Sequence, residues 1–190
     1  MKIRQLLSVV PFLALPLAAQ AAPQTYVLDA HHTFPTFSYS HLGYSTQTSR
    51  FDKTTGKIVY DKETGKGSAE IVIDMKSVST GSTLFNEHIQ GEDYLDTAKY
   101  PTATFKSTTL RWAGNVPVAL EGTLTIKGVT QPVTLKITQF KEMMHPMLKR
   151  EAIGANAIVM VKRSSFNAGK NVPFVGDDVT INIAIEALQE

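Results

Sequence analysis

The chain has 190 residues, among them 19 basic, 17 acidic and no cysteine residues. Without cysteine the protein has no disulfide bonds, thiol chemistry or thiolate metal sites. Lys2 and Arg4 account for the small basic excess. The rest of the chain therefore lacks the basic face that nucleic-acid binders use, and we expect no nucleic-acid partner.

The N-terminus has the features of a cleavable export signal. Lys2 and Arg4 precede an apolar run over residues 6–17, which is too short to span a bilayer comfortably. Ala19-Gln20-Ala21 then fits the small-x-small rule for signal peptidase. We predict a cleaved signal peptide over residues 1–21 and a single domain over residues 22–190. An uncleaved N-terminal anchor is the alternative.

Period-two alternation of apolar and polar residues is the dominant pattern of the remaining chain. It is clear over residues 69–76, 102–108, 118–126, 133–138 and 179–186, and weaker over residues 26–29, 37–41, 56–60 and 156–162. Such alternation predicts strands with one face toward an apolar interior and the other in water. Short turns between the strands favour antiparallel pairing. We predict an all-β protein of roughly eight strands that forms a barrel or a sandwich.

Two segments interrupt the strands. Residues 82–90 predict a short helix over the sheet, with Leu84, Phe85, His88 and Ile89 on one face. Residues 141–151 predict a long loop that carries Met143, Met144, Met147 and Leu148. Flexible methionines suit either a gate to the interior or a subunit interface, so a homodimer is a possibility.

Gly122 stands on the predicted inward face between Leu120 and Leu124. A glycine in a strand interior indicates that a ligand approaches the backbone there, that a large side chain from across the barrel does so, or that the strand has a bulge. The structural explanations are favoured. A barrel of this size can be filled by side chains or can enclose one small ligand, and periodicity leaves both open.

No catalytic or metal-binding motif is found. His31 and His32 are adjacent, and the five histidines show no metal-ligand spacing. No Gly-x-Ser-x-Gly elbow is present. We therefore expect no metal and no enzyme activity, and the alternative is a lipid- or quinone-modifying enzyme that uses His32, His41 or His88 as an acid–base group.

Several stretches resemble the YceI-like family of bacterial periplasmic proteins. They include His41-Leu42-Gly43, Glu87-His88-Ile89, Tyr94-Leu95-Asp96, residues 99–107 and residues 122–130. The resemblance implies a lipocalin-like barrel that holds a polyisoprenoid, such as a ubiquinone-type quinone, in an apolar tunnel. It implies a periplasmic location, transient contact with a membrane, and no cofactor beyond the bound quinone. No catalytic residues are established for the family, so none are carried over.

Under this hypothesis, two groups of side chains contact the lipid. We expect the tunnel to be lined by Phe37, Tyr39, Ile73, Met75, Phe105, Leu120, Gly122, Leu124, Ile126, Ile137 and Ile183. We expect a mouth guarded by Phe85, His88, Tyr94, Met143, Met144 and Phe166.

The sequence departs from the family pattern at two places. Phe85 and Asn86 stand where the family often has arginine and aspartate, and residues 162–167 keep only the arginine and phenylalanine of a family motif. These changes put a polar head-group contact in doubt, although Lys162 and Arg163, expected to be solvated, remain candidates for one. A packed-core protein without a lipid ligand is a further alternative.

Overall fold

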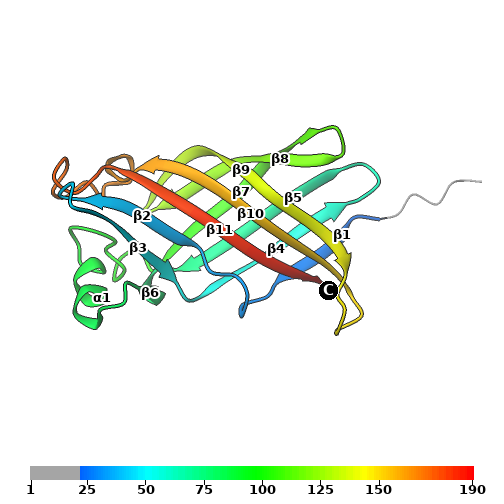
Figure 1. Ribbon diagram of the computed structural model, residues 1–190, viewed down its shortest axis with the longest axis horizontal. Helices are drawn as coiled ribbons and strands as arrows, with labels where there is room; N and C mark the ends of the chain where they lie inside the picture. Colours follow the sequence, from blue (N-terminus) through cyan, green and yellow to red (C-terminus); the bar gives the residue numbers. More distant parts are fainter. Residues whose placement is uncertain (1–21) are drawn as a thin grey trace, which may run out of the picture.

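The computed structural model describes residues 22–190, which form a closed antiparallel barrel with one short helix (Figure 1). The predicted signal peptide, residues 1–21, lies outside the described residues. The helix is α1 (Thr83–Ile89), and two 3-10 turns are η1 (Met75–Ser77) and η2 (Arg163–Phe166). The strands are β1 (Gln24–Leu28), β2 (Thr36–His41), β3 (Ser45–Phe51), β4 (Thr54–Asp61), β5 (Lys66–Asp74), β6 (Val78–Ser79), β7 (Thr102–Ala113), β8 (Val116–Ile126), β9 (Val129–Met144), β10 (Glu151–Lys162) and β11 (Asp178–Gln189).

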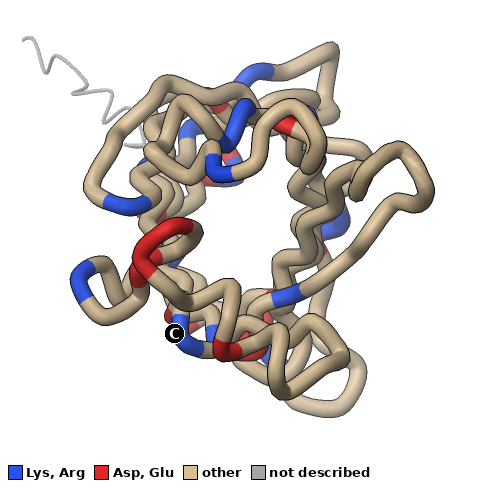
Figure 2. The backbone as a smooth tube through the Cα atoms, turned by 90° about the vertical axis from the view of Figure 1, so that its left-hand side faces the viewer, with Lys and Arg blue, Asp and Glu red and all other residues tan. Residues whose placement is uncertain are grey.

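Eight strands form the ring, in the order β1-β4-β5-β7-β8-β9-β10-β11, and pairing of β1 with β11 closes it. Figure 2 looks into this ring from the end at which α1 lies. Most neighbours in the ring are also neighbours in sequence, because hairpin turns connect them. The predicted antiparallel barrel is confirmed.

One edge of β11 serves two partners. Leu28 of β1 pairs with Ala187, whereas Thr36 of β2 pairs with Asn182. The strands β2, β3 and β6 therefore complete the wall at the α1 end, where β1 and β4 do not reach. The sequence did not predict β3, because its residues are mostly polar and five of the seven are exposed, so the strand shows no alternation.

Three local expectations from the sequence are wrong. Met75 does not continue β5, because the Asp74 side chain accepts a hydrogen bond from the Lys76 amide and starts η1. Met143 and Met144 belong to β9, so the loop after them is shorter than predicted. Val118 is exposed, because the pairing of β7 with β8 shifts register between Arg111 and Trp112.

The helix α1 covers one end of the barrel. The Ser82 hydroxyl accepts a hydrogen bond from the Phe85 amide and caps the first turn, as expected. Ile89 is buried against the barrel, but Leu84 points away from it and is 78% exposed. The four predicted apolar positions therefore do not share one buried face. No helix among residues 22–190 has the length and apolar character needed to span a membrane.

Gly122 is required by packing within the wall. A Cβ atom at this position would collide with the Lys106 carbonyl oxygen and would lie 2.7 Å from the Phe105 ring. Both residues belong to the neighbouring strand β7, and β7 has a register shift just beyond Ser107, the partner of Gly122. The large side chain that approaches Gly122 therefore comes from the adjacent strand.

Replacement of Gly122 by alanine is expected to destabilise the barrel. Overpacking of this kind costs about 1–3 kcal/mol of unfolding free energy. Gly154→Ala is the matched control, because a Cβ atom there would meet nothing closer than 3.9 Å. Urea denaturation, followed by the fluorescence of the single tryptophan, measures both variants. Equal stability of the two variants would contradict this account of Gly122.

Candidate functional site

The inner face of the barrel is unevenly packed. Along β11, Val179 and Ala187 near the two ends are buried, whereas the inward side chains between them, Ile181, Ile183 and Ile185, are only half-buried. The outward residues between them are mostly exposed, so the alternation is intact. Strand β11 is paired with β10 along almost its whole length, whereas on its other edge residues 183–186 lie between the segments that pair with β2 and β1.

The loosely packed side of the interior continues onto the next two strands. Half-buried inward residues there are Ile137 on β9 and Ala155, Ala157, Val159 and Val161 on β10. On the opposite wall Ala69, Ala103, Phe105, Gly122 and Leu124 are buried, whereas Ile71, Ile73, Leu120 and Ile126 are half-buried. The small residues Ala155 and Ala157 were not singled out from the sequence, although the alternation from Ile153 to Val161 contains them.

The predicted lining residues fall into these two walls and into the α1 end. Phe105, Leu124, Phe166, Leu120, Ile126 and Ile183 share one cluster in the interior. Phe37, Ile73 and Met75 pack in a second cluster under α1, and the Tyr39 ring stacks on Phe37 with centroids 6.3 Å apart. Phe166 is 2% exposed and is therefore an interior residue of η2 rather than a mouth residue.

At the α1 end of the barrel, apolar and polar contacts form a clasp between the α1 segment and residues 167–171. Phe85, Tyr94 and Leu95 pack against the cluster that includes buried Ile89, and the His88 ring lies 4.9 Å from the Tyr94 ring. Three polar links then join the segment after α1 to residues 167–171. Lys170 pairs with Asp93 at 3.3 Å, Asn171 donates to the Tyr94 hydroxyl, and Lys127 donates to the Glu92 and Asn167 carbonyls.

Arg163 holds the loop that forms the other half of this clasp. Its guanidinium donates to the backbone carbonyls of Ala168, Lys170, Val175 and Gly176 at 2.5–2.9 Å. Burial lowers the pKa of Arg163 from its usual value. The expectation of a solvated Arg163 is wrong, and its donors are occupied by the protein itself. Lys162 is also engaged, in a 2.8 Å ion pair with Asp178.

Polar side chains gather at the other end of the interior. Tyr26 and Tyr60 are buried there with Phe140 and Trp112 packed against them. The side chain of Glu142 is only 12% exposed and forms an ion pair with Lys62 at 3.1 Å. Burial, and then the charge of Glu142, raise the pKa of both tyrosines, so their hydroxyl groups stay protonated at neutral pH. The sequence analysis missed this group, because its members come from different strands.

The predicted mouth residues lie at two different ends. Phe85 and His88 lie on α1 and Tyr94 follows it. Met143 and Met144 instead lie beside the β9–β10 turn, near the C-terminus (Figure 1). The three histidines considered as acid–base groups are also dispersed. His88 lies on α1, His41 ends β2, and His32 lies on the outside of the wall after β1.

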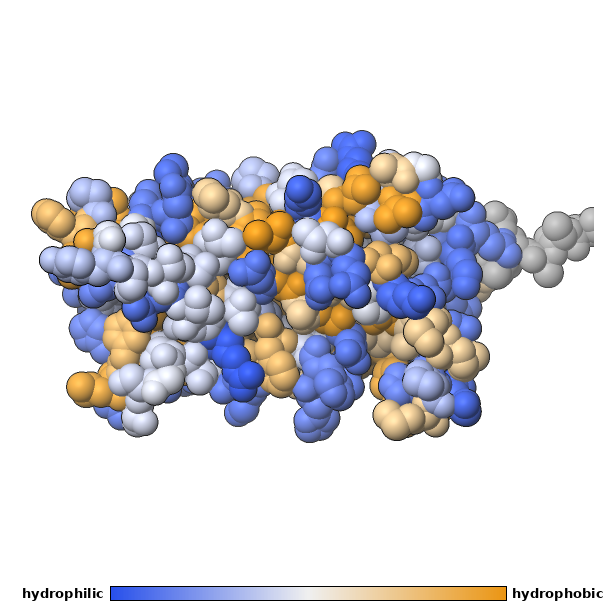
Figure 3. Space-filling view, viewed as in Figure 1, coloured by the Kyte–Doolittle hydropathy of each residue, from blue (hydrophilic) through white to orange (hydrophobic). Residues whose placement is uncertain are grey.

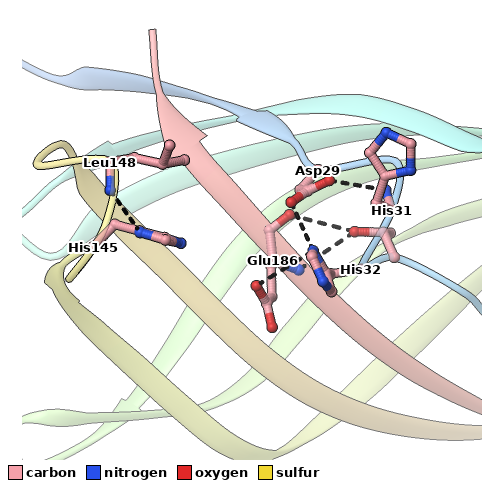
Figure 4. A network of polar contacts seen from close by, with 7 residues as sticks. Asp29, His31, His32, His145, Leu148 and Glu186 are labelled. Carbon is pink, nitrogen blue, oxygen red and sulfur yellow. Dashed lines mark hydrogen bonds and ion pairs between the residues drawn. The ribbon is translucent and has the colours of Figure 1, made fainter.

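His32 belongs to a polar network on that outer surface (Figure 4). Its ring lies 2.8 Å from the Asp29 carboxylate and 4.0 Å from that of Glu186. Buried Thr33 exchanges two hydrogen bonds with the Glu186 backbone, which fixes this turn to β11. One atom each of Asp29, His32 and Glu186 lie within 4.8 Å of one another, as the ligands of a metal ion could. However, two ligands of a tetrahedral zinc ion lie about 3.3 Å apart, and the His32 ring is closer than that to the Asp29 carboxylate. The observed geometry is that of a charge-assisted hydrogen bond.

This network predicts a pH-dependent stability difference. The bond from His32 is the main cause that holds the pKa of Asp29 below 3.8, and the same bond raises the pKa of His32 above 6.5. The contribution of the Asp29 carboxylate to stability is present above pH 3.8 and is lost as the pH falls through the lower pKa that Asp29 has in the folded protein. The imidazolium contribution is present below pH 6.5 and is lost as the pH rises through the higher folded pKa.

His32→Gln is therefore expected to lower the melting temperature more at pH 5.5 than at pH 9. Thermal unfolding at the two pH values measures the difference. His31→Gln is the control, because only the backbone of His31 bonds to Asp29. A loss that is independent of pH would show that the ion pair contributes nothing.

Comparisons of the sequence and of the structure with known proteins find relatives that agree with one another. Residues 26–187 match the model of the YceI-like domain. The Protein YceI of Escherichia coli O6:H1 is 32% identical over 176 residues, 91% of each chain. A UPF0312 protein of Shewanella denitrificans is 39% identical over 127 residues, and the chain spans only 65% of that relative's length. The structure of a polyisoprenoid binding domain from Saccharophagus degradans, described as implicated in plant cell wall breakdown, superposes with a TM-score of 0.63.

That structure is 20% identical, and the match covers 88% of this chain and 99% of the Saccharophagus chain, so the likeness concerns the fold. The domain match extends from the first ring strand to the last and includes the clasped end and the loosely packed wall. The chain belongs to the YceI-like family.

Proposed function

We propose that this protein holds an isoprenoid lipid, of the ubiquinone type, inside its barrel and carries it in the periplasm between membranes. The proposal rests on the half-buried apolar side chains that line β9, β10 and β11 inside a closed ring. Several of these side chains contact the buried cluster around Phe105 and Leu124 but remain only half-buried, and we assign their exposed apolar surface to the lipid. The polyisoprenoid ligand named for the Saccharophagus domain supports the same chemistry.

An isoprenoid tail suits this wall because both surfaces are apolar and neither offers hydrogen bonds. Each buried methylene contributes about 0.8 kcal/mol, so a few isoprene units supply enough free energy for stable binding. Ordering of the tail offsets part of that gain. The tail would lie along β10 and β11, beside Ala157 and Ile183, because Phe105 and Leu124 fill the space near the opposite wall.

The polar group at the non-helical end is suited to the quinone ring. The protonated hydroxyls of Tyr26 and Tyr60 are hydrogen-bond donors for a quinone carbonyl, beside the carboxylate of Glu142. The aromatic rings of Trp112 and Phe140 pack in the same cluster. At the α1 end, in contrast, the Arg163 donors are already satisfied by backbone carbonyls.

Filling the loose wall is expected to reduce lipid occupancy. Ala157→Phe adds a ring to the half-buried inner face of β10, whereas Ala184→Phe adds the same ring to the exposed face of β11. After expression in a quinone-producing bacterium, native mass spectrometry measures the bound fraction. We expect Ala157→Phe to lower it at least several-fold and Ala184→Phe to leave it unchanged, with both variants folded by circular dichroism.

Solvent extraction of the wild-type protein then identifies the ligand. A prenylated quinone with the mass of the bound species supports the proposal. A ligand-free protein that also fails to take up ubiquinone in vitro would overturn it and would favour a packed-core protein. Equal occupancy of the two alanine variants would place the lipid elsewhere on the protein.

A further inference from the structure

The barrel wall divides into two diverging hairpins at the end opposite α1. Pairing between β8 and β9 stops at Ala119 and Lys136. Beyond that point β7 and β8 stay paired as far as Ala113 and Val116, and β9 and β10 stay paired out to Met144 and Glu151. The two turns lie apart at the right-hand end of Figure 1. We call this split the fork.

Exposed apolar side chains lie on both hairpins of the fork. Val116 is 57% exposed and Val118 is also exposed on the β7–β8 hairpin. On the β9–β10 hairpin, Met147 is 81% and Leu148 51% exposed, and Met143 and Met144 are exposed beside them. Figure 3 shows apolar surface at the lower right, where Figure 1 places the β9–β10 turn. An exposed apolar patch of this kind marks an interaction surface.

The β9–β10 turn holds its apolar side chains in a defined position. The Nδ1 atom of His145 accepts hydrogen bonds from the Met147 and Leu148 amides at 3.2 and 3.1 Å. The His145 amide donates to the Arg150 carbonyl, and the Lys149 amide donates to the His145 carbonyl. The tip is therefore an ordered turn whose apolar side chains face solvent.

Unpaired positive charge surrounds this tip. Lys141, Lys149 and Arg150 are exposed, and none of them forms an ion pair with another residue in the range 22–190. The acidic residues of the hairpin are less available, because Glu142 is 12% exposed and forms an ion pair with Lys62, and Glu151 is half-buried. Apolar side chains next to basic ones match the interface of a bilayer that contains anionic lipid.

We propose that the fork docks on an anionic bilayer surface, so that an isoprenoid lipid enters or leaves between the two hairpins. This inference rests on the proposed function and adds the partner and the end at which loading occurs. A second copy of the chain fits the patch less well, because a two-fold contact through the tip would bring its basic residues together. The clasp at the α1 end also favours loading at the fork.

Vesicle flotation tests the docking surface. Wild-type protein is mixed with phosphatidylcholine vesicles with or without phosphatidylglycerol, and the bound fraction is measured. Lys141→Gln/Lys149→Gln is expected to weaken binding to the anionic vesicles by about fivefold per lysine. Met147→Ser/Leu148→Ser is expected to abolish binding to both. Tyr44→Ser/Phe174→Ser is the matched control, because these exposed aromatic residues, 88% and 72% accessible, lie at the α1 end.

The outcomes separate docking from lipid storage. The inference is supported if the two fork variants lose vesicle binding, the control retains it, and all three keep their bound lipid by native mass spectrometry. It is overturned if the control variant loses binding instead, if wild-type protein ignores anionic vesicles, or if the fork variants change only a dimer seen by light scattering. Vesicle binding by a protein that holds no isoprenoid would overturn the proposed function and leave the docking surface standing.

Discussion

Closure of the hydrogen-bonded ring is the constraint on which the other features of this protein depend. Strand β11 is 12 residues long and divides one edge between β1 and β2, while its other edge pairs fully with β10. The chain must therefore cross from β1 to β2 over Glu186. The hydroxyl of buried Thr33 accepts a hydrogen bond from the Glu186 amide, and this hydroxyl and the Asp29 amide both donate to the Glu186 carbonyl. Closure leaves few free edges in the wall and encloses the interior.

Closure also makes the two ends of the barrel different. At one end β6 and η1 turn the chain outward, and α1 can fold back over the opening. Two residues of α1 that depart from the family pattern, Phe85 and Asn86, are uncharged and are held by contacts within this end of the protein. Phe85 packs beneath the helix, and the Asn86 carboxamide oxygen accepts hydrogen bonds from the Thr80 amide and hydroxyl at 2.7 Å. At the other end, the β7–β8 and β9–β10 hairpins extend beyond the last residue pair between β8 and β9, so the wall divides.

Local alternation was sufficient to predict β5, β7, β8, β9 and β11, because each of these strands has one inward and one outward face. It could not predict β3, whose polar residues are exposed on both faces at the edge of the wall. Local alternation also could not predict contacts between residues that are far apart in the sequence. The Thr33–Glu186 bonds join positions 153 residues apart, and the uneven packing depends on Phe105 filling the space that Gly122 leaves on the next strand.

Under the proposed function, the position of polar groups inside the barrel determines the orientation of the ligand. A tail that entered head-last through the fork would lie with its tip beneath α1, among Phe37, Phe51 and Ile73. Its ring would stop beside Tyr26 and Tyr60, close to the fork. The departures from the family pattern at Phe85 and Asn86 affect only the lid. They are therefore compatible with head-group binding at the opposite end, where Tyr26, Tyr60 and Glu142 supply polar groups.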